Sequence, residues 1–187
     1  MALKLNVIIG STRPGRVGPT VAQWFDGFAR EHGAFDVALV DLADFNLPLL
    51  NEAAHPRLQK YEHEATKRWA ASVASADAYV FVTPEYDFFA PASLVNAVQC
   101  VLLEWDYKPA GIVSYGGISG GLRSAQELRQ LLGNVNVHAV MQSVPVPFFS
   151  NFIGDDGVFV PNEPMAEGAK LMLTELHKWA VALKTMR

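Results

Sequence analysis

The chain alternates between short apolar runs and longer segments with helical periodicity. Five runs rich in Val, Ile, Leu and Phe predict buried strands at residues 3–9, 35–42, 78–83, 109–115 and 136–144. Apolar residues at helical spacing predict helices at residues 17–32, 59–76, 91–103, 122–132 and 165–185. Nearly continuous apolar strands are typical of a parallel sheet that is covered by helices on both faces.

This alternation predicts an α/β fold, a three-layer sandwich around a five-stranded parallel sheet. For one domain spanning residues 1–187, the number of strands and the length fit the flavodoxin-like strand order 2-1-3-4-5 better than a six-stranded dinucleotide fold. Ligands of such open sheets bind beyond the carboxyl ends of the strands, where the strand order reverses. We therefore expect the loops after the first, third and fourth strands to line one site.

The loop after the first strand has the composition of a phosphate site. It reads Gly-Ser-Thr-Arg-Pro-Gly-Arg over residues 10–16 and leads into a predicted helix. Unpaired backbone N–H groups and the helix dipole favour an anion there, and Arg13 and Arg16 add positive charge. The spacing Gly10-x4-Gly15 nearly matches the nucleotide-triphosphate loop, but the Lys and the Mg²⁺-binding hydroxyl are missing. We expect a phosphate site without a metal; the alternative is an ordinary connection with solvated arginines.

The two other loops suit a planar ligand. Residues 84–89, Pro-Glu-Tyr-Asp-Phe-Phe, supply aromatic rings and a rigid turn. Residues 116–121, Gly-Gly-Ile-Ser-Gly-Gly, supply glycines, whose backbone can approach a ring closely. Together the three loops fit a flat, polar-edged ligand with a phosphate tail, which is the shape of FMN.

Composition and charge exclude several classes of protein. With 50% hydrophobic and 18% charged residues the chain is globular, and a net charge of −4 without a basic tract disfavours a nucleic-acid partner. The single cysteine, Cys100, rules out an intramolecular disulfide and a multi-cysteine metal site. We expect no membrane insertion and a cytoplasmic location, because the sequence has neither a signal-peptide pattern nor an apolar stretch of about 18 residues.

Three motifs carry a resemblance to a known family. GSTRPGR, TPEYD and KPAGIVSYGGISGGLRSAQELR follow one another within residues 5–144. Together they resemble the NADPH-dependent FMN reductase family, flavodoxin-like proteins also described as NAD(P)H:quinone or azo reductases. The resemblance implies hydride transfer from NADPH or NADH through FMN to a quinone, flavin, azo or similar small-molecule acceptor by a ping-pong mechanism. It implies no catalytic side chain, because the flavin carries the chemistry.

The same resemblance assigns the flavin contacts. It places the FMN phosphate against Ser11, Arg13 and Arg16, with help from the backbone N–H groups of Val17 and Gly18. The isoalloxazine ring would lie along Pro84, Glu85, Tyr86 and Asp87. Its other edge would contact Ser114, Tyr115, Gly116 and Gly117.

One of these positions departs from the family pattern. The family commonly has Asn where this chain has Asp87. If the residue acts only through its backbone, Asp87 is neutral to function. A carboxylate that faced the ring would disfavour the anionic reduced flavin and lower its potential. The sequence is compatible with both interpretations.

Other functions and an assembly state also follow from these patterns. A flavodoxin-type electron carrier typically has a strongly acidic face and a phosphate loop without arginines, so the net charge of −4 and the two loop arginines favour a reductase. A phosphate-ligand-binding hydrolase or transferase without flavin and a flavin-free regulatory domain are further alternatives. Because related reductases are dimers or tetramers with flavin sites at subunit contacts, the resemblance implies a homodimer or homotetramer.

Overall fold

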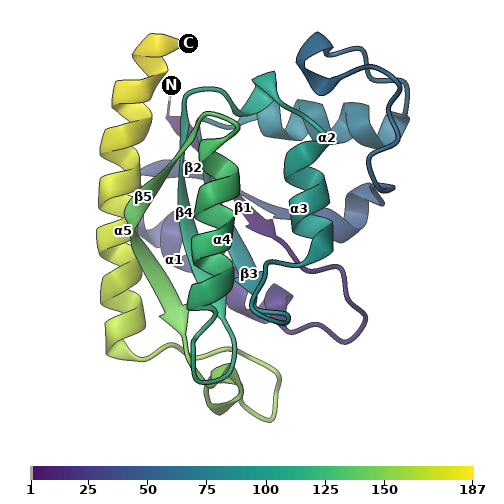
Figure 1. Ribbon diagram of the computed structural model, residues 1–187. Coiled ribbons are helices and arrows are strands. Elements are labelled where there is room, and N and C mark those ends of the chain that lie inside the picture. The colour runs from purple at the N-terminus through teal and green to yellow at the C-terminus, as the bar shows by residue number, and fades with distance from the viewer. Residues whose placement is uncertain (1) are drawn as a thin grey trace.

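The computed structural model describes residues 2–187 and places a twisted parallel sheet between two layers of helices (Figure 1). The strands are β1 (Leu3–Ile9), β2 (Phe35–Asp41), β3 (Ala78–Pro84), β4 (Lys108–Tyr115) and β5 (Val137–Val146). Their order is β2-β1-β3-β4-β5, and neighbouring strands run parallel. The flavodoxin-like order predicted from the sequence is confirmed.

Five α-helices cover the two faces of the sheet. In the described chain, α1 (Gly18–His32) and α5 (Glu163–Leu183) pack on one face; α2 (Glu64–Ser75), α3 (Ala92–Gln99) and α4 (Leu122–Gly133) pack on the other. Successive side chains of a strand point to opposite faces, so Val80 joins the core under α1 and α5 while Phe81 joins the other core. Every residue of β3 is buried, which explains its continuous apolar run.

Two helices are shorter than their hydrophobic patterns predict. The second predicted helix begins at Glu64 rather than residue 59, because Gln59 adopts a left-handed conformation with φ of 51°. Side-chain hydrogen bonds from Gln59 and Tyr61 to the Glu104 carboxylate, at 2.9 and 3.0 Å, hold this segment in an irregular path. The third predicted helix ends at Gln99, so Cys100 follows it rather than lying within it. Cys100 is buried, and burial raises the pKa of its thiol to about 11, which makes it a poor nucleophile.

The edge strand β5 carries a bulge beside Gly111. Its pairing with β4 moves from Ala110–Ala139 to Ile112–Ser143, which leaves extra β5 residues without ladder partners. Arg129 of α4 compensates for this. Its guanidinium donates hydrogen bonds to the backbone carbonyls of residues 139, 140 and 141, at 3.2, 2.5 and 3.1 Å.

Replacing Arg129 with Met is expected to destabilise the fold by about 1–3 kcal/mol, because it leaves bulge carbonyls without their charged donor. The free energy of unfolding in urea measures this effect. Arg68, which is exposed and donates one hydrogen bond of 3.1 Å to the Phe45 carbonyl, provides the matched control. Arg68→Met should change stability by less than about 0.5 kcal/mol. Equal losses of unfolding free energy in Arg129→Met and Arg68→Met would show that the hydrogen bonds from Arg129 to the bulge do not stabilise the fold more than an exposed hydrogen bond does.

Candidate functional site

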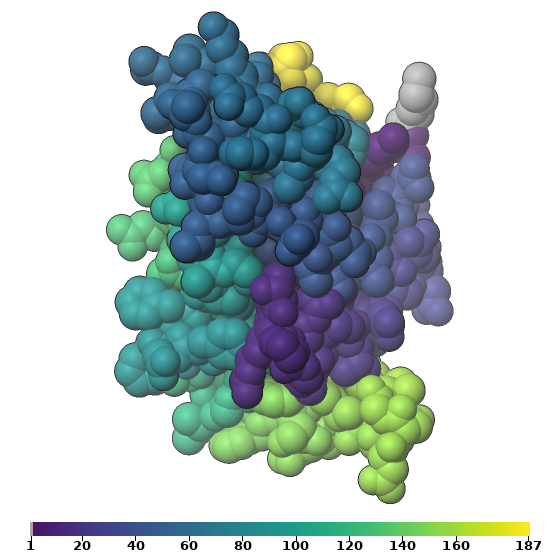
Figure 2. Space-filling model, turned by 90° about the vertical axis from the view of Figure 1, so that its right-hand side faces the viewer, coloured from purple at the N-terminus to yellow at the C-terminus, as the bar shows by residue number. Residues whose placement is uncertain are grey.

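A cleft of about 280 Å³ lies at the carboxyl ends of β1, β3 and β4. The residues lining it come from the expected three loops and from one further segment: Arg13, Gly15, Arg16, Val17, Pro84, Glu85, Tyr86, Tyr115, Gly116 and Phe149. Figure 2 shows the first loop, in purple, at the surface between the blue segment that follows β2 and the light green segment that follows β5. The topology thus brings together the loops that the strand order selects.

The N-terminus of α1 forms one end of this cleft. In the described chain, the helix begins after Val17 with no side-chain cap and with no acidic residue in its first turn. The first-turn N–H groups of a helix lack intrahelical partners and attract anions. This helix end therefore has the properties of an anion site.

The two arginines of the first loop have different surroundings. The Arg16 guanidinium donates to both carboxylate oxygens of Asp41, at 2.8 and 2.5 Å, and to the Ser11 carbonyl at 2.5 Å. Arg13, which is exposed, forms no ion pair within residues 2–187 and lies 5.9 Å from the centre of the Tyr86 ring. Arg13 is therefore the loop arginine whose charge is available to a ligand.

Several of the residues assigned by resemblance support the cleft from behind rather than line it. Ser11 is buried, and its hydroxyl lies 2.9 Å from the Tyr86 hydroxyl, which links the first loop to the second. Gly18 leaves room for the Tyr115 ring, since a Cβ there would lie 2.7 Å from the tyrosine hydroxyl oxygen. The buried Ser114 hydroxyl donates to the Gly120 carbonyl at 2.9 Å and closes the third loop.

The turn after β3 is strained and exposed. Tyr86 and Phe89 exchange backbone hydrogen bonds of 3.0 and 2.9 Å across a two-residue turn. Asp87 and Phe88 have φ of 48° and 77°, the left-handed conformation found in type I′ turns. Asp and Asn both tolerate this conformation, whereas an aromatic residue rarely adopts it. Asp87 thus meets the same backbone requirement as Asn, and neither it nor Gly117 is among the residues that line the cleft.

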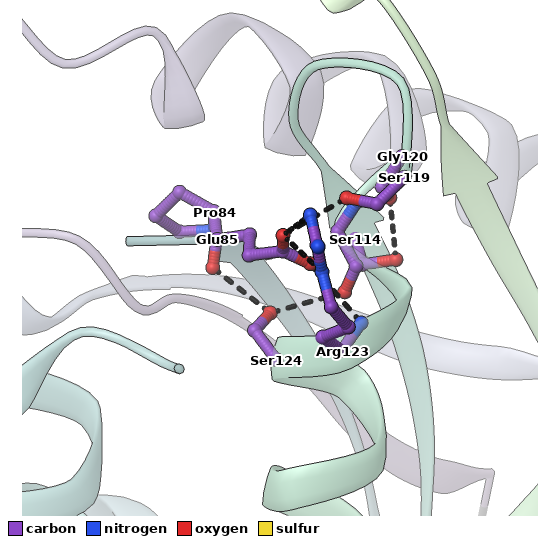
Figure 3. Close-up of polar contacts among 8 residues, drawn as sticks. Pro84, Glu85, Ser114, Ser119, Gly120, Arg123 and Ser124 are labelled. Atoms are coloured by element: carbon purple, nitrogen blue, oxygen red, sulfur yellow. Dashed lines mark hydrogen bonds and ion pairs between the residues drawn. The ribbon is translucent and has the colours of Figure 1, made fainter. Parts of the chain in front are cut away.

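Glu85 joins the second loop to the third through the network in Figure 3. Its carboxylate accepts hydrogen bonds from the Ser119 hydroxyl at 3.0 Å, from the Arg123 backbone N–H at 3.1 Å and from Arg123 Nε at 2.8 Å. The Arg123 guanidinium also stacks over the Phe88 ring, 3.7 Å from its centre. The start of α4 therefore fixes the turn after β3.

These contacts set the protonation of Glu85. Burial alone would raise the pKa of Glu85, but the hydrogen bonds from Arg123 and Ser119 outweigh it and hold the pKa below the ordinary value of 4.5. A carboxylate with a lowered folded pKa stabilises the fold above its unfolded pKa, and this stabilisation is lost as the pH falls through the folded pKa.

Glu85→Gln is therefore expected to be less stable than wild type at neutral pH. The difference in unfolding free energy should shrink as the pH falls below the ordinary glutamate pKa of 4.5 and through the lowered folded pKa, because the wild-type carboxylate becomes protonated over that range. Urea unfolding at a series of pH values measures the difference. If it stays constant over this range, the Glu85 charge is not the source of the stabilisation.

Residues from outside the three loops also shape the site. Phe149, just after β5, lines the cleft and packs edge-to-face on Tyr115, with ring centres 5.6 Å apart. Its backbone N–H donates to the Gly116 carbonyl at 3.3 Å. The aromatic run that follows the last strand was the available sequence signal for it. Asp41 and Arg123 are ionic partners that no local pattern indicated.

A second depression of about 280 Å³ lies on the other side of the first loop, lined by Thr12, Leu42, Ala43, Asn46, Leu47, Ser93 and Asn96. Two of its polar side chains are already used within the protein. Ser93 donates to the Gly10 carbonyl at 2.8 Å, and Asn96 binds the Pro48 carbonyl and the Leu50 N–H, each at 2.8 Å. Its polar groups hold the adjacent loops together, so the cleft at Tyr86 is the better candidate for a ligand.

The described residues lack two further kinds of feature, a membrane-spanning helix and a cluster of metal ligands. Within residues 2–187, no helix combines the length and the apolar character needed to cross a membrane. The same residues contain no group of three His, Cys, Asp or Glu side chains placed to bind a metal ion.

Comparison with known proteins places the chain in a family. Residues 3–151 match the sequence model of the NADPH-dependent FMN reductases. An NAD(P)H-dependent FMN reductase of Schizosaccharomyces pombe is 38% identical over 148 residues, which cover 77% of this chain and 74% of that protein. A quinone reductase of Pseudomonas putida is 31% identical over 132 residues, or 67% of each chain.

The fold is also found among solved structures. FerB, a flavoenzyme NAD(P)H:(acceptor) oxidoreductase from Paracoccus denitrificans, superposes with a TM-score of 0.76 over 97% of this chain and 98% of its own, at 19% sequence identity. At that identity the likeness establishes the shared fold. The match of residues 3–151 and the sequence identity to curated relatives establish more: this chain belongs to the NADPH-dependent FMN reductase family.

Proposed function

We propose that this protein binds FMN in the cleft at Tyr86 and Tyr115 and uses NAD(P)H to reduce a small-molecule acceptor. The observation that carries the proposal is the N-terminus of α1, which has no side-chain cap, at one end of a cleft walled by aromatic rings and glycine. Arg13, which forms no ion pair within residues 2–187, lies beside it. Membership of the FMN reductase family supports the cofactor and the type of reaction.

The residues present fit FMN. Arg13 and the first-turn N–H groups of α1 would hold the phosphate by charge-assisted hydrogen bonds. The segments 84–87 and 114–117 would flank the ring, and the N-terminus of α4 favours negative charge at the second of these edges. When bound, FMN would supply the chemistry of hydride transfer between NAD(P)H and the acceptor.

The protein's own side chains bind and orient rather than transfer protons. Among the described residues that line the cleft, the carboxylate is that of Glu85, and Arg123 and Ser119 donate hydrogen bonds to it. We therefore propose no catalytic acid or base. Since the two substrates would use one exposed ring face in turn, we propose ping-pong kinetics. We propose a quinone as the acceptor class, because the similar Pseudomonas putida protein is a quinone reductase.

Titration with FMN followed by steady-state kinetics tests this function. We expect FMN to bind with quenching of its fluorescence. We also expect parallel double-reciprocal plots when NADPH and a benzoquinone are varied together. Intersecting lines would contradict the ping-pong mechanism. Binding of FMN with negligible NADPH oxidation would favour an electron carrier, and no FMN binding would favour another phosphorylated ligand.

The rim of the cleft has the composition of a subunit contact. Phe88 and Phe89 in the turn after β3 and Ile118 in the loop after β4 are 57%, 60% and 80% exposed, and large exposed apolar side chains are candidates for contact with another subunit. We propose a homodimer or homotetramer that buries this rim and acts in the cytoplasm, where NAD(P)H is supplied. Light scattering at micromolar concentration should give a mass at least twice 20.5 kDa, and a monomer would contradict the proposal.

A further inference from the structure

We propose that Asp41 is a positioning residue for the FMN phosphate and acts through Arg16. This inference rests on the proposed function, because it concerns the phosphate end of the same cleft. Asp41 would not touch the ligand. It would hold Arg16, and Arg16 would hold the loop whose backbone and Arg13 bind the phosphate.

The geometry of the ion pair supports this role. Arg16 binds Asp41 through two parallel hydrogen bonds of 2.8 and 2.5 Å, and their side chains are only 17% and 20% exposed. A bidentate pair of guanidinium and carboxylate fixes orientation as well as distance. The same guanidinium reaches the Ser11 carbonyl at 2.5 Å, so it connects the end of β2 to the beginning of the phosphate loop.

Asp41 is itself held in place. It is the last residue of β2, and its carboxylate accepts a hydrogen bond of 3.0 Å from the Ala43 N–H at the start of the short 3-10 helix Leu42–Phe45. Ile9, the last residue of β1, pairs with Asp41 in the sheet. The Asp41–Arg16 ion pair therefore connects the backbone of the sheet to the phosphate loop.

The pair also changes the charge balance at the phosphate. Because Asp41 neutralises Arg16, Arg13 is left as the net positive side chain of the loop. If Arg16 were instead a direct phosphate ligand, removing the Asp41 charge would free it and strengthen FMN binding. The two roles thus predict opposite effects of one substitution.

The test compares FMN with riboflavin, which lacks the phosphate, in wild type and Asp41→Asn. Asp41→Asn should raise the Kd for FMN about tenfold, the size expected from losing one charge-assisted hydrogen bond, and leave the Kd for riboflavin unchanged. Arg16→Lys should show the same loss because an ammonium cannot bind two oxygens in parallel. The double variant Arg16→Lys with Asp41→Asn should lose no more FMN affinity than the more affected of the two single variants.

Asp26→Asn is the matched control. Asp26→Asn changes the net charge by the same amount as Asp41→Asn. Asp26 forms its ion pair with Arg30 on α1, away from the phosphate loop. The variant should leave both dissociation constants unchanged.

Each other result overturns the inference. Unchanged or tighter FMN binding by Asp41→Asn would make Arg16 a direct ligand. If Asp41→Asn weakened the binding of FMN and riboflavin equally, Asp41 would support the structure of the site in general and would not position the phosphate loop in particular. If wild type binds both flavins equally, the phosphate site is misplaced and the inference fails, whereas flavin binding itself stands. If wild type binds neither flavin, the proposed function fails together with the inference.

Discussion

Arg13→Ala is expected to weaken FMN binding by about 1.5–3 kcal/mol, which corresponds to roughly a ten- to 150-fold increase in Kd. The reason is that Arg13 is the loop arginine without an ion-pair partner in the described chain, whereas Arg16 is held by Asp41. No carboxylate among the described residues would compete with the phosphate for the Arg13 guanidinium. Fluorescence titration with FMN measures the loss.

Riboflavin and a distant arginine provide the controls for this variant. Riboflavin affinity should be unchanged, because Arg13 is proposed to contact the phosphate alone. Arg57→Ala removes the same charge from an exposed position in the connection between β2 and α2 and should leave FMN affinity unaltered. If Arg13→Ala bound FMN as tightly as wild type, the phosphate would have to lie elsewhere.

Gly121→Ala is expected to destabilise the fold by about 2–5 kcal/mol, from left-handed strain and overpacking together. Gly121 precedes α4 with φ of 79°. A Cβ there would lie 2.7 and 2.9 Å from the Tyr115 backbone N and O, which cannot move without disturbing β4. Because Tyr115 lines the cleft, FMN binding should be lost as well.

Gly27→Ala is the matched control for this substitution. Gly27 lies within α1, and a Cβ there would have no neighbour within 4 Å. This variant should be more stable than wild type by about 0.5–1 kcal/mol, since Gly is a poor residue for a helix interior. The free energies of unfolding in urea of Gly121→Ala and Gly27→Ala, each relative to wild type, measure both effects. A Gly121→Ala protein as stable as wild type would show that the backbone of the third loop can shift to accommodate a Cβ at this position.

The arrangement of the sheet was predictable because it depends on local patterns. Short apolar runs rich in β-branched residues, such as the fully buried β3, favour strands covered on both faces, and their number and spacing leave few topologies. Once the order was known, the rule for open sheets selected the three loops, and Arg13, Tyr86 and Tyr115 do lie around one cleft.

Contacts between distant segments were not predictable in the same way. Nothing near Arg16 in the sequence indicates that Asp41, 25 positions later, accepts its hydrogen bonds. The late start of α2 has the same kind of cause, since it depends on hydrogen bonds to Glu104. Periodicity reports which side of an element is buried, but it does not report which polar partner a side chain meets.

Reduction of the FMN-loaded protein by NADPH in the absence of oxygen tests the central claim most directly. The cleft formed by the loops at Arg13, Tyr86 and Tyr115 is proposed to present flavin to NAD(P)H and then to an acceptor. We predict that the visible flavin absorbance bleaches within seconds of mixing and returns when a quinone is added. Flavin that stays oxidised with NADPH and bleaches only with dithionite would contradict the reductase function.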